Sequence, residues 1–380
     1  MPPQTYHIGF SKNWNDVPTS TTHVLREIAK REPTLWVESI GTRAPKLTNA
    51  RDVGHLFTRI KRFFTKASKK DHQLKVLSPL LLPTPQTRLQ YGINQRLFSH
   101  YLKREGIDKK NQHLTFWSFL PNTFKLIEPY RERSKLIYYC TDDWPLFSRL
   151  NEKFIRKQEN ELIAAADILF VTSKFLGRKL KQLTERPVHY VSHGVPYAQF
   201  ARAVKIDMPK PTYLSNLKPG PTVGFYGNFS NWLDQPLIRG LAEAKPDWQF
   251  VMIGSVNDSI TPLTDLKNLH FPGRIEHNDL PQWCAHFNAG FIPYDMKLEQ
   301  LKSVNPIKCR EMLSAGLPIV TPMMEDLEDL YPDVRRATTL EEWIDSLEIQ
   351  CERQDRAAIS ERRAQDDWPK KVDNLMEIVK

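Results

Sequence analysis

Short apolar runs alternate with longer amphipathic segments along the first half of the chain. The runs are rich in β-branched and aromatic residues, which favour strands, and the segments between them have apolar residues at helical spacing. Strand, helix and strand at this spacing form βαβ units and predict a parallel sheet. The predicted strands cover residues 6–10, 34–40, 74–82, 114–119, 135–140, 167–173 and 188–191, and the predicted helices cover 22–31 (capped by Ser20 or Thr21), 88–104 and 152–166.

The same alternation returns in the second half of the chain after a break. Residues 202–221 have no periodicity and contain four prolines, which is typical of a linker between domains. A chain of 380 residues is also expected to form two domains, at a prior of about 150 residues each. Beyond the break, strands are predicted at 222–226, 249–254, 289–294 and 317–320, and helices at 277–286, 339–352 and 353–380.

The stretch 303–321 combines a loop, a short helix, a tight turn and a buried strand. Pro306 suits the first helical position, where its missing N–H costs nothing, and Gly316 can take the left-handed conformation that ends the helix. Free N–H groups and the dipole at the helix start favour an anion, which Lys308 in the first turn would neutralise. Glu311 follows on the same face and could accept two ribose hydrogen bonds of about 1.5–3 kcal/mol each. On spacing alone, a surface helix with a solvated Lys/Glu pair explains these residues about equally well.

The pattern Asn305-Pro306-x-Lys308-x-x-Glu311-x-x-Ala-x-Gly316 resembles the nucleotide-diphosphate-sugar site of GT-B glycosyltransferases, especially family 4 (glycosyl transferase group 1). The resemblance implies an α/β fold of two Rossmann-like domains facing across a cleft, with the donor nucleotide on the second domain and the acceptor on the first. It also implies that the helix N-terminus and Lys308 hold the donor diphosphate, and that Glu311 binds the ribose.

Further segments follow the order of the family's motifs. The loop 227–234, with Gly227, Trp232 and Asp234, resembles the family's Tyr-x-Gly-x-x-x-x-Trp-x-Asp segment beside the donor phosphates and sugar, and in the family the residues that follow the position of Gly273 hold the nucleobase. A sugar-contacting Glu of the family corresponds to Ser303 here, so that half of the motif is altered. The donor-site residues implied in this way are His193, Gly227, Asn228, Arg274, Ile275, Tyr294, Asn305, Ile307, Lys308 and Glu311.

The predicted strand 135–140 runs into Asp142 and Asp143. Acidic side chains at the carboxyl end of a buried strand lie where open α/β sheets build their sites, and a carboxylate there can take a proton from an attacking hydroxyl. One of the two is expected to cap the following helix instead. The strand end Tyr-x-x-Thr-Asp resembles that of the xanthan-type glucuronosyltransferases, which implies that Asp142 is the base. The candidate catalytic residues are therefore Asp142, Asp143 and Lys308. Cys140 has no matching His pattern and is read as a small buried apolar residue.

A net charge of +10 and a pI of about 9.3 predict an anionic partner. Residues 51–75 interleave cations with bulky apolar residues, which is typical of an interfacial helix attracted to anionic lipid. A helix packed on its own domain with a solvated basic face is the alternative. Nucleic-acid binders also carry such patches, but the chain has no zinc-finger spacing and no arginine/glycine repeat. The four cysteines lack metal or redox spacing, which favours reduced thiols in a cytosol.

Together these features predict a metal-independent glycosyltransferase with a UDP- or GDP-type donor, no further cofactor and no nucleic-acid partner. The expected acceptor is a saccharide, membrane-associated or lipid-linked, of bacterial surface polysaccharide synthesis. The expected location is cytoplasmic, at the inner face of the membrane through residues 51–75. The predicted domains are 1–204, with 366–380 packing back on it, and 205–365. A non-catalytic nucleotide-sugar-binding relative is the main alternative, followed by a basic nucleic-acid-binding protein.

Overall fold

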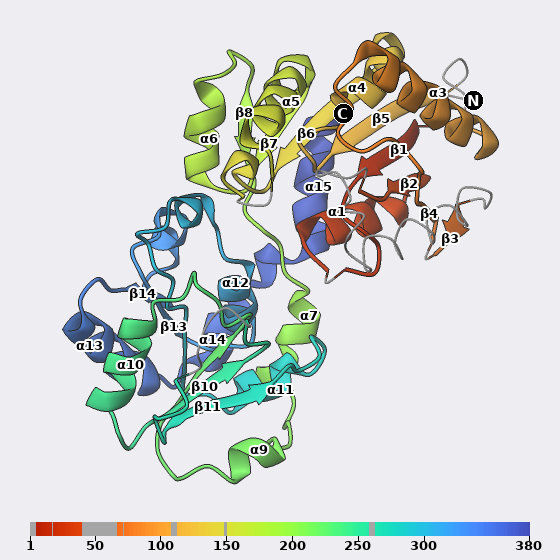
Figure 1. Cartoon of the computed structure of the whole chain (residues 1–380). Helices are drawn as coiled ribbons and strands as arrows, with labels where there is room; N and C mark the ends of the chain where they lie inside the picture. The colour runs from red at the N-terminus through yellow and green to blue at the C-terminus, as the bar shows by residue number, and fades with distance from the viewer. Residues whose placement is uncertain are drawn as a thin grey trace. The chain divides into compact units, whose positions relative to one another are not determined.

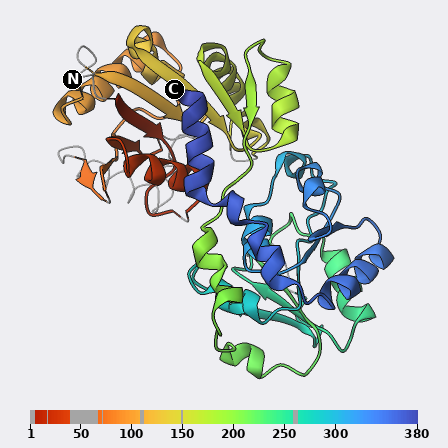
Figure 2. The same ribbon diagram turned by 180° about the vertical axis from the view of Figure 1, so that it is seen from behind.

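The computed structural model describes residues 5–16, 18–39, 67–70, 72–107, 112–147, 150–257 and 263–380. They form two compact units, unit 1 (Met1–Ser192 with Val372–Lys380) and unit 2 (His193–Lys371), which are seen from opposite sides in Figures 1 and 2. The chain passes from unit 1 to unit 2 after Ser192, before the predicted boundary at 204/205, and returns to unit 1 after Lys371, beyond the predicted boundary at 365/366. The first boundary lies earlier than predicted because α7 (Tyr197–Phe200) and α8 (Arg202–Lys205) pack on helices of unit 2.

Unit 1 is built on a sheet whose described strands run in the order β3-β4-β2-β1-β5-β6-β7-β8. All pairs are parallel except β3 with β4, and apart from β3 the order is that of a Rossmann fold. The strands between the edge strands β3 and β8 are largely buried on both faces, which explains their continuous apolar runs. They are β1 (Thr5–Phe10), β2 (Thr34–Val37), β3 (Ser68–Lys69), β4 (Leu74–Leu77), β5 (His113–Ser118), β6 (Ser134–Cys140), β7 (Ile168–Val171) and β8 (Val188–Tyr190).

The helices of unit 1 largely match the predicted ones. The first begins at Ser20 with Thr19 as its N-cap, so the predicted cap was one or two residues too late. Within the predicted basic stretch 51–75, residues 51–66 and 71 lie outside the described residues, and the remainder forms β3 and the start of β4. The helices are α1 (Ser20–Ala29), α3 (Arg88–Arg104), α4 (Phe124–Ile127), η1 (Glu128–Arg133), η2 (Trp144–Leu146), α5 (Glu152–Ala165), α6 (Lys174–Lys181) and the end of α15 (Trp368–Val379).

Unit 2 has an all-parallel sheet with the order β11-β10-β9-β12-β13-β14, which is again the Rossmann order. The order reverses between β9 and β12, and in open α/β sheets ligands bind at the carboxyl ends of the strands at such a point. The predicted linker 202–221 lies inside this unit, and its Leu214 is buried in the unit's core. The strands are β9 (Thr222–Tyr226), β10 (Gln249–Ile253), β11 (Leu269–Gly273), β12 (Ala289–Phe291), β13 (Ile319–Thr321) and β14 (Val334–Arg336).

The helices of unit 2 include the one that carries the predicted motif. It begins at Ile307, with Pro306 as its N-cap rather than its first residue, and Gly316 after its end has φ +71°, as predicted. The predicted helix 277–286 begins only at Leu280, so residues 274–279 are loop. The helices not yet given are α9 (Thr212–Ser215), α10 (Gln235–Ala244), α11 (Leu280–Ala285), η3 (Glu299–Ser303), α12 (Ile307–Ser314), η4 (Glu325–Leu330), α13 (Leu340–Cys351), α14 (Arg356–Glu361) and η5 (Ala364–Asp366).

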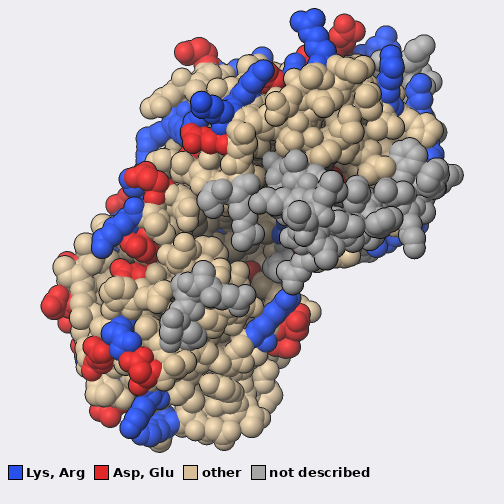
Figure 3. Space-filling model, viewed as in Figure 1, with Lys and Arg blue, Asp and Glu red and all other residues tan. Residues whose placement is uncertain are grey.

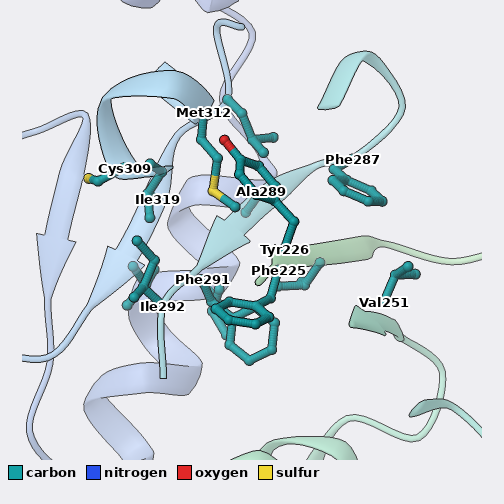
Figure 4. Close-up of a cluster of buried hydrophobic side chains, with 14 of the residues drawn as sticks. Phe225, Tyr226, Val251, Phe287, Ala289, Phe291, Ile292, Cys309, Met312 and Ile319 are labelled. Atoms are coloured by element: carbon teal, nitrogen blue, oxygen red, sulfur yellow. The ribbon is translucent and has the colours of Figure 1, made fainter. Parts of the chain in front are cut away.

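Apolar packing fixes α12 against the sheet of unit 2. Figure 4 shows Phe225 and Tyr226 of β9 and Met312 of α12 within one buried cluster. At Gly290 of β12 a Cβ atom would lie 2.8 Å from the Met312 sulfur, so this close approach requires glycine. The position of α12 is thus set by packing, and the polar side chains of its first turns are placed with it.

Candidate functional site

The loop that follows β9 lies directly against the first turn of α12. Gly227 donates its N–H to the carbonyl of Ile253 at 2.8 Å and has φ +148°. A Cβ atom at position 227 would lie 2.5 Å from Lys308 Nζ. The backbone conformation therefore favours glycine, and any side chain at this position would displace the Lys308 amine.

Lys308 is held by aromatic rings rather than by a carboxylate. Its Nζ lies 4.7 Å from the ring centre of Phe225 and 5.5 Å from that of Tyr294. The side chain is half-buried, and within the described part of the chain Nζ has no hydrogen-bond or ion-pair partner. Cation–π contacts position an ammonium group without neutralising it. Lys308 therefore presents an uncompensated positive charge at the carboxyl edge of the sheet.

Glu311, one turn further along α12, is buried and held from two sides. Its Oε1 accepts a hydrogen bond from His277 Nε2 at 2.8 Å, and its Oε2 accepts one from the Tyr226 hydroxyl at 3.1 Å. Each carboxylate oxygen has two lone pairs, so each can accept one further hydrogen bond. The carboxylate is thus fixed in orientation and still able to bind two neighbouring hydroxyl groups.

Two partners of Glu311, His277 and Tyr226, were not among the predicted site residues. The His277 ring is oriented by Gln199, whose Nε2 lies 3.3 Å from Nδ1, and by the edge of the Phe200 ring at 5.4 Å. The hydrogen bond to Glu311 raises the pKa of His277, and burial together with Glu311 raises that of Tyr226. Neither residue was singled out from the sequence, because their role depends on tertiary structure, which brings the end of β9 and the loop before α11 to α12.

The remaining predicted donor-site residues differ in how they are placed. The side chain of Arg274 is largely exposed, 3.9 Å from Glu276, and Asn228 is also exposed. Asn305 is buried, Ile307 is half-buried, and Ile275 packs on the core of unit 2. Ser303, at the position of the family's sugar-contacting Glu, donates its hydroxyl to the carbonyl of Gln300 at 3.0 Å.

His193 lies in a different environment from Lys308. It is half-buried, and burial, with the positive charges of Arg310 and Lys371, lowers its pKa to about 3. Its imidazole is therefore neutral at pH 7. In unit 2 it lies near the positive charges of Arg310 and Lys371, a grouping that the sequence did not predict.

In unit 1, the two predicted acids at the end of β6 have different partners. Asp143 is buried and forms an ion pair with Lys179 of α6. Asp142 is half-buried and accepts a hydrogen bond from the Thr141 hydroxyl at 2.7 Å, and burial raises its pKa. Cys140 is fully buried with a raised pKa, and its thiol donates to the carbonyl of Asp142 at 3.4 Å. Among the described residues, Asp142 is therefore the carboxylate of this strand end that has no cationic partner.

We compared the sequence and the fold with those of known proteins. No protein-family model matches the chain. TuaH of Bacillus subtilis (strain 168), named as a candidate teichuronic acid biosynthesis glycosyltransferase, is 29% identical over 219 residues. That match covers 54% of each chain, so it spans about half the length of this curated relative.

Solved structures match over nearly the whole chain at low sequence identity. The sucrose-phosphate synthase of Thermosynechococcus elongatus has a TM-score of 0.67 at 11% identity, covering 99% of this chain and 98% of that one. Anabaena HepE in complex with UDP-glucose has a TM-score of 0.63 at 11% identity, covering 98% and 99%. The E. coli trehalose-6-phosphate protein bound with UDP-2-fluoro glucose has a TM-score of 0.66 at 10% identity, covering 98% of both. The chain therefore has the GT-B fold, as its resemblance to GT-B glycosyltransferases predicts.

Proposed function

We propose that this protein is a glycosyltransferase that moves a sugar from a nucleotide-diphosphate sugar to a hydroxyl group of an acceptor. The observation that carries the proposal is the pair on α12: an uncompensated Lys308 and, one turn away, a Glu311 carboxylate fixed by His277 and Tyr226. Lys308 can bind the negative charge of a diphosphate, and the Glu311 carboxylate can accept hydrogen bonds from a ribose diol. The spacing of the two groups fits a nucleoside diphosphate. The name of the partial relative TuaH and the sugar nucleotides bound in the HepE and E. coli structures support this reading.

The donor is proposed to be of the UDP type, as in those two solved structures. Lys308 and the N-terminus of α12 would stabilise the departing diphosphate, where negative charge develops in the transition state. They would serve in place of a divalent cation. Within the described residues, no group of three His, Cys, Asp or Glu side chains is arranged to hold one.

Asp142 is the proposed base for a reaction that inverts the anomeric centre, and it would position the acceptor hydroxyl in one that retains it. Its raised pKa suits a group that must take up a proton near neutral pH. Asp143 is the weaker candidate because its charge is already neutralised by Lys179.

The proposed acceptor is a saccharide of a bacterial surface polymer, held at the inner membrane face. The TuaH resemblance supports the polymer, and the basic composition of residues 51–75, outside the described region for most of its length, supports the membrane contact. None of the described helices is long and apolar enough to cross a bilayer. On the face shown in Figure 3, basic and acidic side chains are interspersed over unit 2, a distribution that does not favour nucleic acid.

Isothermal titration with UDP, GDP and ADP, with and without EDTA, tests the donor site. UDP should bind the wild type with or without EDTA, and K308M and E311Q should each lose at least about tenfold in affinity. K302M is the matched control, because Lys302 is an exposed lysine of the same stretch paired with Glu299. Equal UDP affinity in all four proteins would refute the proposed site.

Turnover separates an enzyme from a non-catalytic relative. Release of UDP from UDP-glucose, with and without added saccharide acceptors, should be measurable for the wild type and should fall by about 100-fold or more in D142N. UDP binding should persist in that variant. A wild type that binds UDP but never releases it from any UDP-sugar would contradict the enzymatic part of the proposal.

A further inference from the structure

The opposite face of α12 carries a buried arginine with unmet hydrogen-bonding capacity. Arg310 is only 5% exposed, and its Nε and Nη1 atoms have no hydrogen-bond acceptor in the described structure. The guanidinium group also forms no ion pair there. Positions 308 and 310 differ by roughly 200° around a helix, so Arg310 projects away from the proposed donor site.

A second buried arginine comes from the segment that packs on this face. The Ser360 hydroxyl donates to the Ser314 carbonyl at 2.6 Å, which ties the end of α14 to the α12 turn that follows Arg310. Arg363, three residues after Ser360, is 8% exposed, and its Nε likewise has no acceptor among the described residues. Its Nη1 donates to Asp366 at 3.3 Å.

The acid that pairs with Arg363 is Asp366. Asp366 also pairs with Lys371 at 2.9 Å, so Arg363 and Lys371 share this acid, whereas Arg310 has no ion pair among the described residues. The segment that begins unit 2 lies against Asp366: Val195 donates its N–H to the carbonyl of Asp366 at 2.8 Å and forms an isolated β-bridge with Asp367. His193 lies at this edge and feels the charges of Arg310 and Lys371, but it is neutral and adds no charge of its own.

Such a cluster is short of negative charge. Among the described residues Arg310 has no acidic partner and Arg363 shares Asp366 with Lys371, and buried charges are stable only when they are paired and hydrogen-bonded. The unused donors are guanidinium N–H groups, whose planar geometry matches carboxylate and phosphate oxygens. We propose that Arg310 and Arg363 bind an oxyanion, a phosphate or a carboxylate group, beside His193 and on the face of α12 opposite to Lys308. This inference goes beyond the proposed function and does not depend on nucleotide binding.

Titration of the whole protein with inorganic phosphate tests the site, with potassium chloride at equal ionic strength as the reference salt. The wild type should bind phosphate, and R310M should lose at least about tenfold in affinity, because a charged, hydrogen-bonding donor is removed. R310M should fold normally, since methionine fills similar space without a buried unpaired charge. R310K should retain part of the affinity. R239M, which removes an exposed arginine of α10, should bind phosphate as the wild type does.

A second titration distinguishes the two sources of the oxyanion. If the site takes a separate ion or acid, saturating UDP should leave phosphate affinity unchanged, and glucuronate should compete with phosphate where glucose does not. If UDP abolishes phosphate binding, the phosphate occupies the nucleotide's own site and the proposal is overturned. Absence of phosphate-specific binding in the wild type, or undiminished binding in R310M, would overturn it as well.

Discussion

The hydrogen bond between His277 and Glu311 gives the sharpest test of the donor site. His277→Ala removes the donor that holds Glu311 Oε1 and leaves Tyr226 on Oε2 alone. The carboxylate then gains rotational freedom about its last torsion. A ribose diol needs both oxygens in one orientation, so the substitution should weaken ribose binding while sparing the contacts of the diphosphate.

The size of the effect follows from distance and exposure. A hydrogen bond to a charged group contributes about 1.5–3 kcal/mol, and the 2.8 Å separation is typical of a strong one. The His277 side chain is 36% exposed, so water can replace part of the lost bond, whereas Glu311 is only 7% exposed. After this discount for solvent screening we expect a loss of about 1 kcal/mol in UDP binding, or roughly fivefold in Kd.

The assay compares UDP with 2′,3′-dideoxyuridine diphosphate, which has no diol for Glu311. Titration calorimetry on the wild type should favour UDP, and H277A should lower UDP affinity while leaving the dideoxy ligand unaffected. H286A is the matched control, because His286 is a half-buried histidine of the same unit bonded to the Met208 carbonyl. An equal loss for both ligands would show that His277 supports the fold rather than Glu311, and unchanged UDP affinity would refute the reasoning.

Three further predictions concern stability. Glu311 raises the pKa of His277 above its usual value of about 6.5. The hydrogen bond should therefore stabilise the fold fully below that pH, and less as the pH rises through the higher pKa of the folded state. In urea unfolding, the difference in unfolding free energy between wild type and H277A should be larger at pH 5.5 than at pH 9. Asp143→Asn should lower the unfolding free energy by about 2 kcal/mol, because it leaves Lys179 without its acidic partner beside a buried site. Asp142→Asn should be neutral or stabilising, because burial already raises the pKa of that acid. The opposite ranking of the two variants in chemical denaturation would contradict this. Gly227→Ala should lower stability by about 1–3 kcal/mol, because a φ of +148° strains an alanine, and it should weaken UDP binding, because the new Cβ atom would displace the Lys308 amine. A thermal midpoint equal to that of the wild type would contradict the first expectation.

The sequence by itself determined the order of elements and the fold class. Apolar runs such as 222–226 and 249–254 became strands β9 and β10, because strands buried on both faces must be apolar throughout. The end of helix α12 could also be predicted from Gly316, because a glycine in the left-handed conformation commonly follows the end of a helix. The motif on α12 could be located for the same reason: its residues are close in sequence, and helical spacing alone places Lys308 and Glu311 on one face.

Tertiary structure decided everything that depends on segments far apart in the chain. Tyr226 contacts Glu311 from the end of β9, and His277 contacts it from the loop before α11. The periodicity of apolar residues in the sequence carries no information about such contacts. The same holds for Asp142 and Asp143, adjacent in sequence, of which only Asp143 meets a lysine from α6. Arg310 is the clearest case: it was not singled out from the sequence, and the structure buries it on a helix, α12, on which α14 packs. Local spacing fixes which face of an element a side chain occupies, but the energy of a charge is set by what the fold places opposite that face.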